Sequence, residues 1–143
     1  QYQNIIIYSK STTSILSWDN TNQTLIKKIS QEINHNKIFI FCGLADPISF
    51  FQSSKKHYSN LYIKKTYSDH FQYQNNDKFL EHCTLAQQKK INTFVTSYKD
   101  FVKLQNDNNF MSINIKWEIV DIEYSVPDSI LKNFALNKTK KNL

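Results

Sequence analysis

The sequence predicts an α/β fold in which a mostly parallel β-sheet is flanked by helices. Short apolar segments rich in β-branched and aromatic residues alternate along the chain with segments of helical periodicity. In addition, the apolar segment at residues 37–42 is continuous, which is typical of a strand buried on both faces of a parallel sheet. We predict a single domain over residues 1–136, followed by a disordered basic tail at residues 137–143.

The first predicted elements are two strands and a helix. Residues 4–8 (NIIIY) and 14–18 are short apolar segments typical of strands. A polar turn follows at residues 19–22. Apolar residues then recur at helical spacing and predict an amphipathic helix up to about His35. These apolar residues are Leu25, Ile26, Ile29 and Ile33.

The strand at residues 37–42 (KIFIFC) leads into the only glycine of the chain, Gly43. Asp46 and Pro47 then predict a helix start, because Asp is a preferred N-cap and Pro suits the first helical position. Ligands of open α/β sheets bind at such strand-to-helix turns, and a helix N-terminus favours anions. The alternative interpretation is structural, with Gly43 forming the turn and Asp46 capping the helix.

The second half of the chain continues the alternation of strands and helices. Strands are predicted at residues 60–65, 93–96 and 113–119, the last with apolar residues at alternate positions. Helices are predicted after the N-cap residue Asn76, after Ser97 and from Pro127 onward. The first of these helices is predicted to bury Phe79, Leu80, Cys83 and Ala86, and the last is predicted to face Ile130, Leu131 and Phe134 inward. The short helix between them carries the apolar residues Phe101, Val102 and Leu104.

Charge and cysteine content exclude several classes of function. The net charge is +6, but the basic residues are scattered, and the one dense cluster is Lys138, Lys140 and Lys141 near the end. Because aromatic and basic residues do not interleave in an RNA-binding pattern, we predict no nucleic-acid partner. Cys42 and Cys83 lack metal-type spacing, so no metal site is predicted.

No phosphate-binding loop is recognisable in this sequence. A Walker A loop requires glycines and a Lys-Ser/Thr pair, so that backbone N–H groups can wrap phosphate. The chain has one glycine and contains no such motif. We therefore expect no nucleotide cofactor to bind this chain alone.

A polar segment at residues 67–71 (YSDHF) places Asp69 beside His70 after a predicted strand. A carboxylate can orient an imidazole, which titrates near neutral pH and can serve as an acid or base. The sequence therefore offers a candidate catalytic pair. The alternative is that both side chains are surface residues without a role in chemistry.

Residues 96–100 (TSYKD) form a third motif, at a predicted strand-to-helix junction. Thr96 and Ser97 supply hydroxyl groups and Lys99 supplies an amine, which together offer a candidate phosphate- or substrate-binding group. The alternative is a capping box, in which an acid three residues after Ser97 completes the cap and the lysine faces solvent.

These three motifs, in this order and spacing, resemble the C-terminal half of the tetraacyldisaccharide 4'-kinase family. That family has a strand ending in a turn of the type C-G-I-A-N-P. An F-x-D-H segment follows, and then a strand-to-helix junction of the type T-T-E-K-D-A-V-K-L. The corresponding segments here are residues 41–47 (FCGLADP), 67–73 (YSDHFQY) and 95–104 (VTSYKDFVKL).

The resemblance implies the C-terminal lobe of a P-loop kinase that phosphorylates a lipid A precursor. The complete enzyme would move the γ-phosphoryl group of ATP, with Mg²⁺, onto the 4'-hydroxyl of a lipid A disaccharide 1-phosphate. It would work with an N-terminal P-loop lobe at the cytoplasmic face of the inner membrane of a Gram-negative bacterium. The phosphate-binding loop and the Asp base are expected in that N-terminal lobe, which is missing here.

The resemblance also assigns roles to residues of this chain. His70 matches the histidine that supports the catalytic Asp base, and Asp69 would fix its imidazole. Thr96, Ser97 and Lys99 would face the substrate. The chain departs from the family at Tyr98, which replaces a Glu, and at Ser97, which replaces a Thr.

A second hypothesis belongs to another class of protein. The chain would then be a free-standing, non-catalytic α/β module that binds anionic lipid or a partner protein through its basic surface. Salt-sensitive binding to anionic vesicles would favour this hypothesis, and ATP-dependent phosphoryl transfer by the complete enzyme would favour the first.

Overall fold

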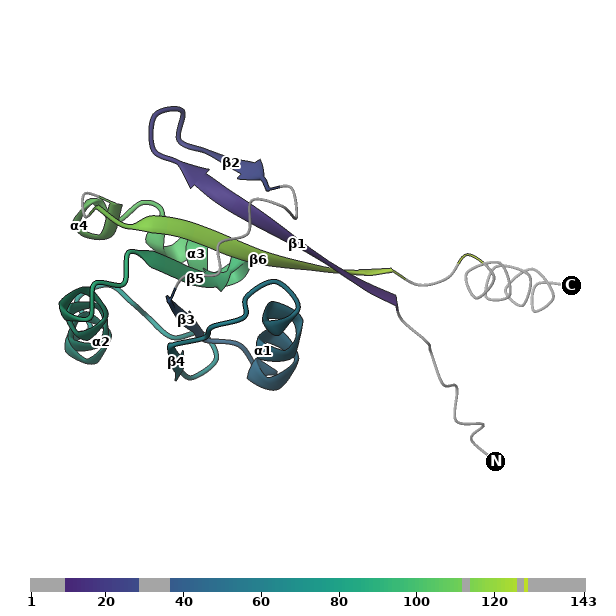
Figure 1. Cartoon of the computed structure of the whole chain (residues 1–143), viewed down its shortest axis with the longest axis horizontal. Coiled ribbons are helices and arrows are strands. Elements are labelled where there is room, and N and C mark those ends of the chain that lie inside the picture. Colours follow the sequence, from purple (N-terminus) through teal and green to yellow (C-terminus); the bar gives the residue numbers. More distant parts are fainter. Residues whose placement is uncertain (1–9, 29–36, 112–113, 126–127, 129–143) are drawn as a thin grey trace, which may run out of the picture. The chain divides into compact units, whose positions relative to one another are not determined.

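The computed structural model describes residues 10–28, 37–111, 114–125 and 128 (Figure 1). Its strands are β1 (Lys10–Asp19), β2 (Thr24–Lys27), β3 (Ile38–Cys42), β4 (Ile63–Thr66), β5 (Thr93–Ser97) and β6 (Lys116–Ser125). Its helices are α1 (Pro47–Lys55), α2 (Asp77–Gln88), α3 (Tyr98–Leu104) and α4 (Asn108–Met111).

The six strands form one sheet in the order β2-β1-β6-β5-β3-β4. β3 pairs in parallel with both β4 and β5, and β5 pairs in parallel with β6, whereas β1 and β2 pair antiparallel. The predicted α/β fold with a mostly parallel sheet is therefore confirmed. The parallel strands place their carboxyl ends at one edge of the sheet, where the loops after β3, β4 and β5 begin.

The chain divides into two compact units. The larger unit, Ser14–Asp121, contains the core and every candidate site residue. The smaller unit combines Gln1–Thr13 with Ile122–Leu143, and its described residues are the outer parts of β1 and β6 together with Asp128. The single domain at residues 1–136 stays a prediction, and the tail at residues 137–143 lies outside the described residues. Within the described ranges, no helix has the length and apolar character required to span a membrane.

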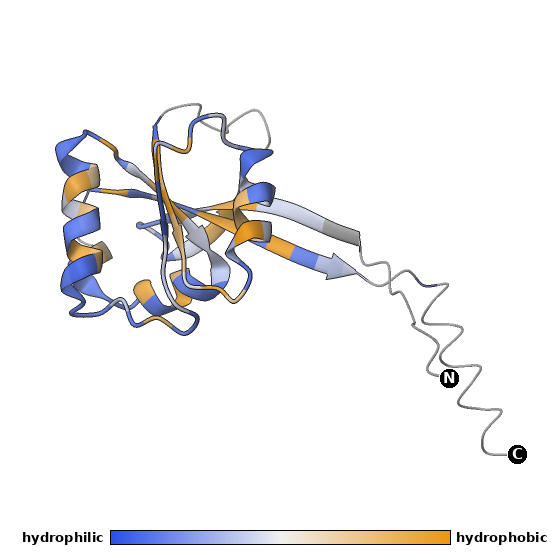
Figure 2. Ribbon diagram, turned by 90° about the horizontal axis from the view of Figure 1, so that it is seen from below, coloured by the Kyte–Doolittle hydropathy of each residue, from blue (hydrophilic) through white to orange (hydrophobic). Residues whose placement is uncertain are grey.

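The main core joins the middle of the sheet to α2 and α3. All five residues of β3 are buried, as expected for a strand covered on both faces. Phe41 contacts Phe79 of α2 and Trp117 of β6 in edge-to-face geometry, with ring centroids 5.1 and 6.2 Å apart. Figure 2 shows hydrophobic and hydrophilic residues alternating along the helices, which is the amphipathic pattern expected of elements packed on a sheet.

Local capping signals in the sequence set the starts of three helices. The side chains of Asp46, Asn76 and Ser97 accept hydrogen bonds from the third backbone N–H of α1, α2 and α3, each at 3.1 Å. All three predicted helix starts are confirmed. One predicted buried residue on these helices was wrong, because Leu80 is 40% exposed.

The helix predicted to begin at Leu25 is a strand in the part that the structure describes. β2 pairs with β1, with Trp18 opposite Leu25, and the Asp19 side chain accepts from the N–H of Thr21 at 2.8 Å to close the turn. Leu25 packs on the core and Ile26 is 53% exposed, so the apolar pair follows strand alternation rather than a helical face. Residues 29–36 lie outside the described residues.

The remaining predicted elements differ from the observed ones mainly at their ends. The strands predicted at residues 14–18, 60–65, 93–96 and 113–119 correspond to β1, β4, β5 and β6. β6 is not the alternating strand that was predicted, because Glu118 and Val120 are buried along with Trp117 and Ile119. The strand predicted at residues 4–8 and the helix predicted from Pro127, with Ile130, Leu131 and Phe134, lie outside the described residues.

Candidate functional site

The candidate site lies at the edge of the sheet where β3, β4 and β5 end. These three strands are neighbours and run in parallel, so the loops that follow them come together. The N–H of Tyr67 donates to the carbonyl of Cys42 at 2.8 Å, which joins the first two loops. The three motifs at residues 41–47, 67–73 and 95–104, which are separate in the sequence, therefore meet at one place in the fold.

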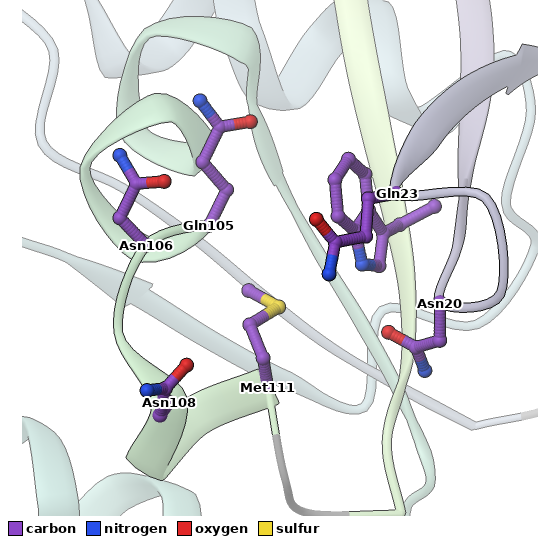
Figure 3. Close-up of a pocket in the computed structure, with 7 residues that line it drawn as sticks. Asn20, Gln23, Gln105, Asn106, Asn108 and Met111 are labelled. Carbon is purple, nitrogen blue, oxygen red and sulfur yellow. The ribbon is translucent and has the colours of Figure 1, made fainter.

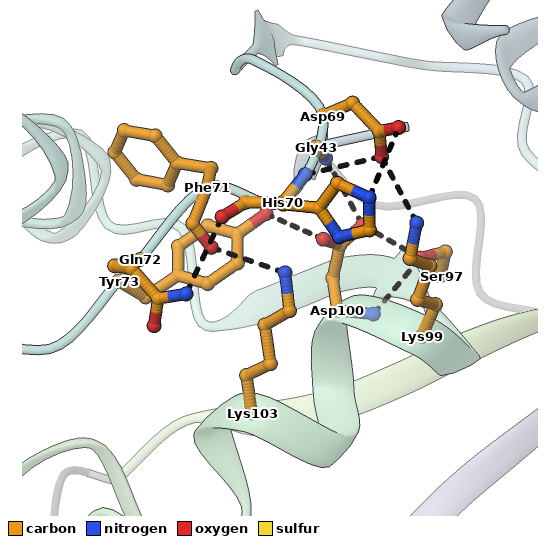
Figure 4. A network of polar contacts seen from close by, with 10 residues as sticks. All are labelled: Gly43, Asp69, His70, Phe71, Gln72, Tyr73, Ser97, Lys99, Asp100 and Lys103. Carbon is orange, nitrogen blue, oxygen red and sulfur yellow. Dashed lines mark hydrogen bonds and ion pairs between the residues drawn. The ribbon is translucent and has the colours of Figure 1, made fainter. Parts of the chain in front are cut away.

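A buried carboxylate, Asp100, connects all three loops (Figure 4). Its Oδ2 accepts from the N–H of Gly43 at 3.0 Å and from the hydroxyl of Ser97 at 2.6 Å. Its Oδ1 accepts from the hydroxyl of Tyr73 at 2.9 Å. Burial and the neighbouring Asp100 carboxylate raise the pKa of the Tyr73 hydroxyl, which therefore stays protonated and remains a donor.

Gly43 occurs where the chain passes close to this carboxylate. A Cβ at this position would lie 3.0 Å from the backbone carbonyl oxygen of Ser68, 3.2 Å from Oδ1 of Asp100 and 3.2 Å from Cβ of Phe71. The backbone of Gly43 does not have a positive φ. Space rather than backbone conformation therefore explains why a glycine stands here.

Asp69 and His70 lie on the surface beside this buried network. The imidazole Nε2 of His70 is 3.5 Å from Oδ2 of Asp69, and the His70 side chain is 77% exposed. Lys99 Nζ donates to Oδ1 of Asp69 at 2.9 Å. This hydrogen bond and the nearby imidazole hold the pKa of the Asp69 carboxyl below its usual value, so the carboxylate is charged at neutral pH.

His70 has a left-handed backbone conformation, with φ of 61°. This region is uncommon for residues other than glycine, although histidine is among those enriched there. The N–H of His70 donates to Oδ1 of Asp69 at 3.0 Å and supports the turn. Asp69 therefore stabilises the turn that exposes the imidazole of His70 to solvent.

The three candidate substrate-binding residues occupy different environments. Lys99 is half-exposed and already contacts Asp69. Thr96 is buried, and its hydroxyl donates to the carbonyl of Phe41 at 2.9 Å. Ser97 is also buried and donates to Asp100. The structure thus brings Lys99, Asp69 and His70 together on the surface, while Thr96 and Ser97 lie beneath them. Their substrate-binding roles stay a prediction.

Asp100 was predicted only as the acid of a capping box, and no role was predicted for Tyr73. The partners of Asp100 stand 57 residues away at Gly43 and 27 residues away at Tyr73, so no local pattern pairs them. The one available signal was the aspartate at the end of the strand-to-helix motif, at an edge where ligands of α/β sheets usually bind.

A cavity of about 550 Å³ lies elsewhere, between the β1–β2 turn and the end of α3 (Figure 3). Trp18, Met111 and five amide side chains line it. The amide residues are Asn20, Gln23, Gln105, Asn106 and Asn108. Among the described residues that line it, no side chain is charged, whereas Asp69, His70 and Lys99 bring ionisable side chains together at the sheet edge. We therefore place the candidate site at the Asp69–His70 edge.

A second buried carboxylate, Glu118 of β6, is bound in a separate network. Its Oε1 contacts Lys28 Nζ at 2.6 Å and Lys116 Nζ at 3.0 Å, and its Oε2 accepts from the hydroxyl of Tyr58 at 2.7 Å. Within the described ranges, no group of three or more His, Cys, Asp or Glu side chains is arranged to hold a metal ion.

Comparison with known proteins gives consistent matches. The profile of the family described as tetraacyldisaccharide-1-P 4'-kinase matches residues 3–139. A tetraacyldisaccharide 4'-kinase of Halothermothrix orenii is 29% identical over 145 residues, covering 95% of this chain and 38% of the relative. The enzyme of the same name from Rickettsia bellii is 31% identical over 83 residues, covering 57% of this chain and 25% of the relative. No solved structure matches significantly. The chain thus spans well under half the length of these curated relatives.

Proposed function

The chain belongs to the tetraacyldisaccharide-1-P 4'-kinase family, and we propose that it is the C-terminal part of such an enzyme. In this proposal the complete enzyme transfers the γ-phosphoryl group of ATP to the 4'-hydroxyl of a lipid A disaccharide 1-phosphate. It acts at the cytoplasmic face of the bacterial inner membrane. This chain supplies one side of the active site, and an N-terminal P-loop lobe supplies the other.

The arrangement of Asp69, His70 and Lys99 carries the proposal. The three side chains converge at the sheet edge where open α/β proteins bind ligands, and His70 is exposed enough to reach a partner. Because Asp69 lies beside Nε2 of the imidazole, Nδ1 is left to interact with a group from the other lobe. We propose that His70 orients and tunes the carboxylate base that takes the proton of the sugar hydroxyl.

Asp69 acts in this proposal by fixing the imidazole. Its carboxylate is 3.5 Å from Nε2 of His70 and accepts from the His70 N–H, so it constrains both the ring and the backbone. Lys99 in turn holds Asp69 at 2.9 Å. In this proposal Lys99 fixes Asp69 by a hydrogen bond, and Asp69, at ion-pair distance from the imidazole, favours the orientation that an acid–base partner requires.

In this proposal the binding of ATP and Mg²⁺ is not assigned to residues of this chain. The sequence contains no Walker A motif, and the described residues offer no cluster of three metal-ligating side chains. We therefore assign both to the remainder of the complete enzyme and derive no step through them from these residues.

We expect His70→Ala to lower turnover of the complete enzyme by about 100-fold or more, the scale of a positioned acid–base partner. ATP-dependent phosphorylation of the lipid A disaccharide 1-phosphate is measured at saturating substrate. His57→Ala is the matched control, because His57 follows α1 and is not part of the candidate site. The 143-residue chain alone serves as the blank and is expected to show no transfer.

Turnover of the His70→Ala enzyme within about threefold of the unmodified enzyme would remove His70 from the mechanism. Transfer by the 143-residue chain alone would contradict the assignment of the phosphate-binding loop to another lobe. If the complete enzyme is inactive and this chain instead binds anionic vesicles in a salt-sensitive manner, the non-catalytic module becomes the better account.

A further inference from the structure

We infer that Asp100 is a positioning residue for this reaction, because it and two neighbouring lysines of α3 fix the loop that carries His70. The inference rests on the proposed function, in which the imidazole of His70 contributes to phosphoryl transfer. In this inference, residues in the first turns of α3 hold that imidazole in place.

Helix α3 contacts the His70 loop at three points (Figure 4). Lys99 Nζ donates to Asp69 at 2.9 Å, just before His70. Lys103 Nζ donates to the carbonyl of Phe71 at 3.1 Å, just after it. Asp100 accepts from the hydroxyl of Tyr73 at 2.9 Å. The loop is therefore held on both sides of His70 by one helix.

Asp100 is the buried member of this set and the one with the most partners. Its side chain is fully buried, while Lys99 and Asp69 are partly exposed. A buried carboxylate that accepts three hydrogen bonds is held more firmly than an exposed ion pair, whose contribution to stability is about 0 to 1 kcal/mol. Asp100 thus forms the firmest contact between α3 and the loop, and Lys99 and Lys103 add weaker contacts at the surface.

The position of His70 depends on its backbone more than on contacts of its ring. Among the described residues, the ion-pair partner of the imidazole is Asp69, which belongs to the same loop. A shift of the loop would therefore carry the imidazole with it. A displacement of about 1 Å in a catalytic site can lower a rate about 100-fold, so loosening the Tyr73–Asp100 contact is expected to affect turnover.

Asp100→Asn and Tyr73→Phe test this inference in the complete enzyme. Asn keeps the shape but replaces one acceptor by a donor, and Phe keeps the ring but removes the hydroxyl. We expect kcat to fall about 10- to 100-fold for Asp100→Asn and less for Tyr73→Phe, with KM for ATP changed less than about twofold. The imidazole resonances of His70, followed by NMR in the same protein, are expected to shift in both variants.

Glu118→Gln is the matched control, because it also removes a buried charge but belongs to the network of Lys28 and Tyr58. It is expected to leave the His70 resonances and the kcat of the folded enzyme unchanged. Should Asp100→Asn fail to fold, Tyr73→Phe retains the carboxylate and carries the test by itself.

Unchanged His70 resonances and unchanged kcat in Tyr73→Phe and Asp100→Asn would overturn the inference. So would equal shifts in Glu118→Gln, because the effect would then be a general loosening of the fold. If the resonances move but neither these variants nor His70→Ala changes turnover, the loop contact stands and the catalytic role of His70 is what fails.

Discussion

Among the described residues, Asp100 and Glu118 are buried carboxylates that are held by different kinds of hydrogen-bond partner. Both side chains are fully buried, and each accepts hydrogen bonds from three partners or more. Glu118 forms ion pairs with two lysines, Lys28 and Lys116. Asp100 accepts from a backbone N–H and two hydroxyls, and in the described part of the chain no cation lies within ion-pair distance of it.

This difference separates a structural network from one that shapes the candidate site. Glu118 is located on β6, where two lysines and the hydroxyl of Tyr58 hold its carboxylate. Asp100 lies beside the turn at Gly43 and below the exposed pair of Asp69 and His70. Neutral donors hold the carboxylate in one geometry, and the lysine next to it, Lys99, is left to pair with Asp69 at the surface. The contrast can be tested by comparing variants of the two residues.

The largest effect on stability is expected for Glu118→Ala. Removing this carboxylate breaks its buried ion pair with Lys28, and breaking a buried ion pair costs about 3 to 5 kcal/mol. Asp100→Ala leaves neutral donors unpaired and is expected to cost about 2 to 3 kcal/mol. Urea unfolding of both variants at neutral pH measures the difference. A greater loss for Asp100→Ala would contradict this ranking.

A smaller loss of stability is expected for Gly43→Ala, because the added methyl group would lie against Asp100 and its neighbours. The added Cβ would meet the Ser68 carbonyl oxygen at 3.0 Å, and overpacking of this kind costs about 1 to 3 kcal/mol. Because Gly43 donates to Asp100, the cost is expected to be non-additive with Asp100→Asn and additive with Glu118→Gln. Urea unfolding measures these costs. If the cost of Gly43→Ala is additive with both substitutions, Gly43 is not energetically coupled to Asp100.

The smallest effect is expected for Glu118→Gln, in the way the free energy of unfolding depends on pH. Burial alone would raise the pKa of the Glu118 carboxyl, but hydrogen bonds from Lys28, Tyr58 and Lys116 outweigh it and lower the pKa below its ordinary value of 4.5. A lowered pKa in the folded state means that Glu118 stabilises the fold above pH 4.5 and loses this contribution as the pH falls through its folded value.

Glu118→Gln should therefore lose less stability than the unmodified protein between neutral pH and pH 3, an interval that includes the ordinary value of 4.5 for this carboxyl. The urea midpoint of both proteins is compared across this range. The exposed Asp19, Asp46 and Asp69, whose pKa values are also lowered by hydrogen bonds, are unchanged in the variant and serve as the common background. An identical acid slope in the two proteins would show that Glu118 contributes nothing to it.

Features encoded within a few residues were predictable from the sequence. Asp46, Asn76 and Ser97 each cap a helix through an N–H three residues later, so the sequence alone contained the information. The continuous apolar segment of β3 likewise predicted a strand buried on both faces. The order of these elements was enough to predict the fold class.

Features that depend on distant residues were not predictable. The helical spacing from Leu25 onward was misleading, because pairing with Trp18 on β1 turns the first residues into a strand. The role of Asp100 was missed, since its partners Gly43 and Tyr73 come from other loops. Lys99 was predicted to meet a phosphate, and only the structure places Asp69 next to it.

The order of strands in the sheet also has a consequence for how the chain folds. β3 to β6 pair among themselves within one continuous stretch of sequence, whereas β1, near the start, is hydrogen-bonded beside β6. Closing that pair requires the whole stretch from β2 to α4 to be looped out, which is entropically costly before other contacts exist. The parallel half of the sheet, which carries the candidate site, is therefore expected to assemble first, with β1 and β2 joining it in a later and slower step.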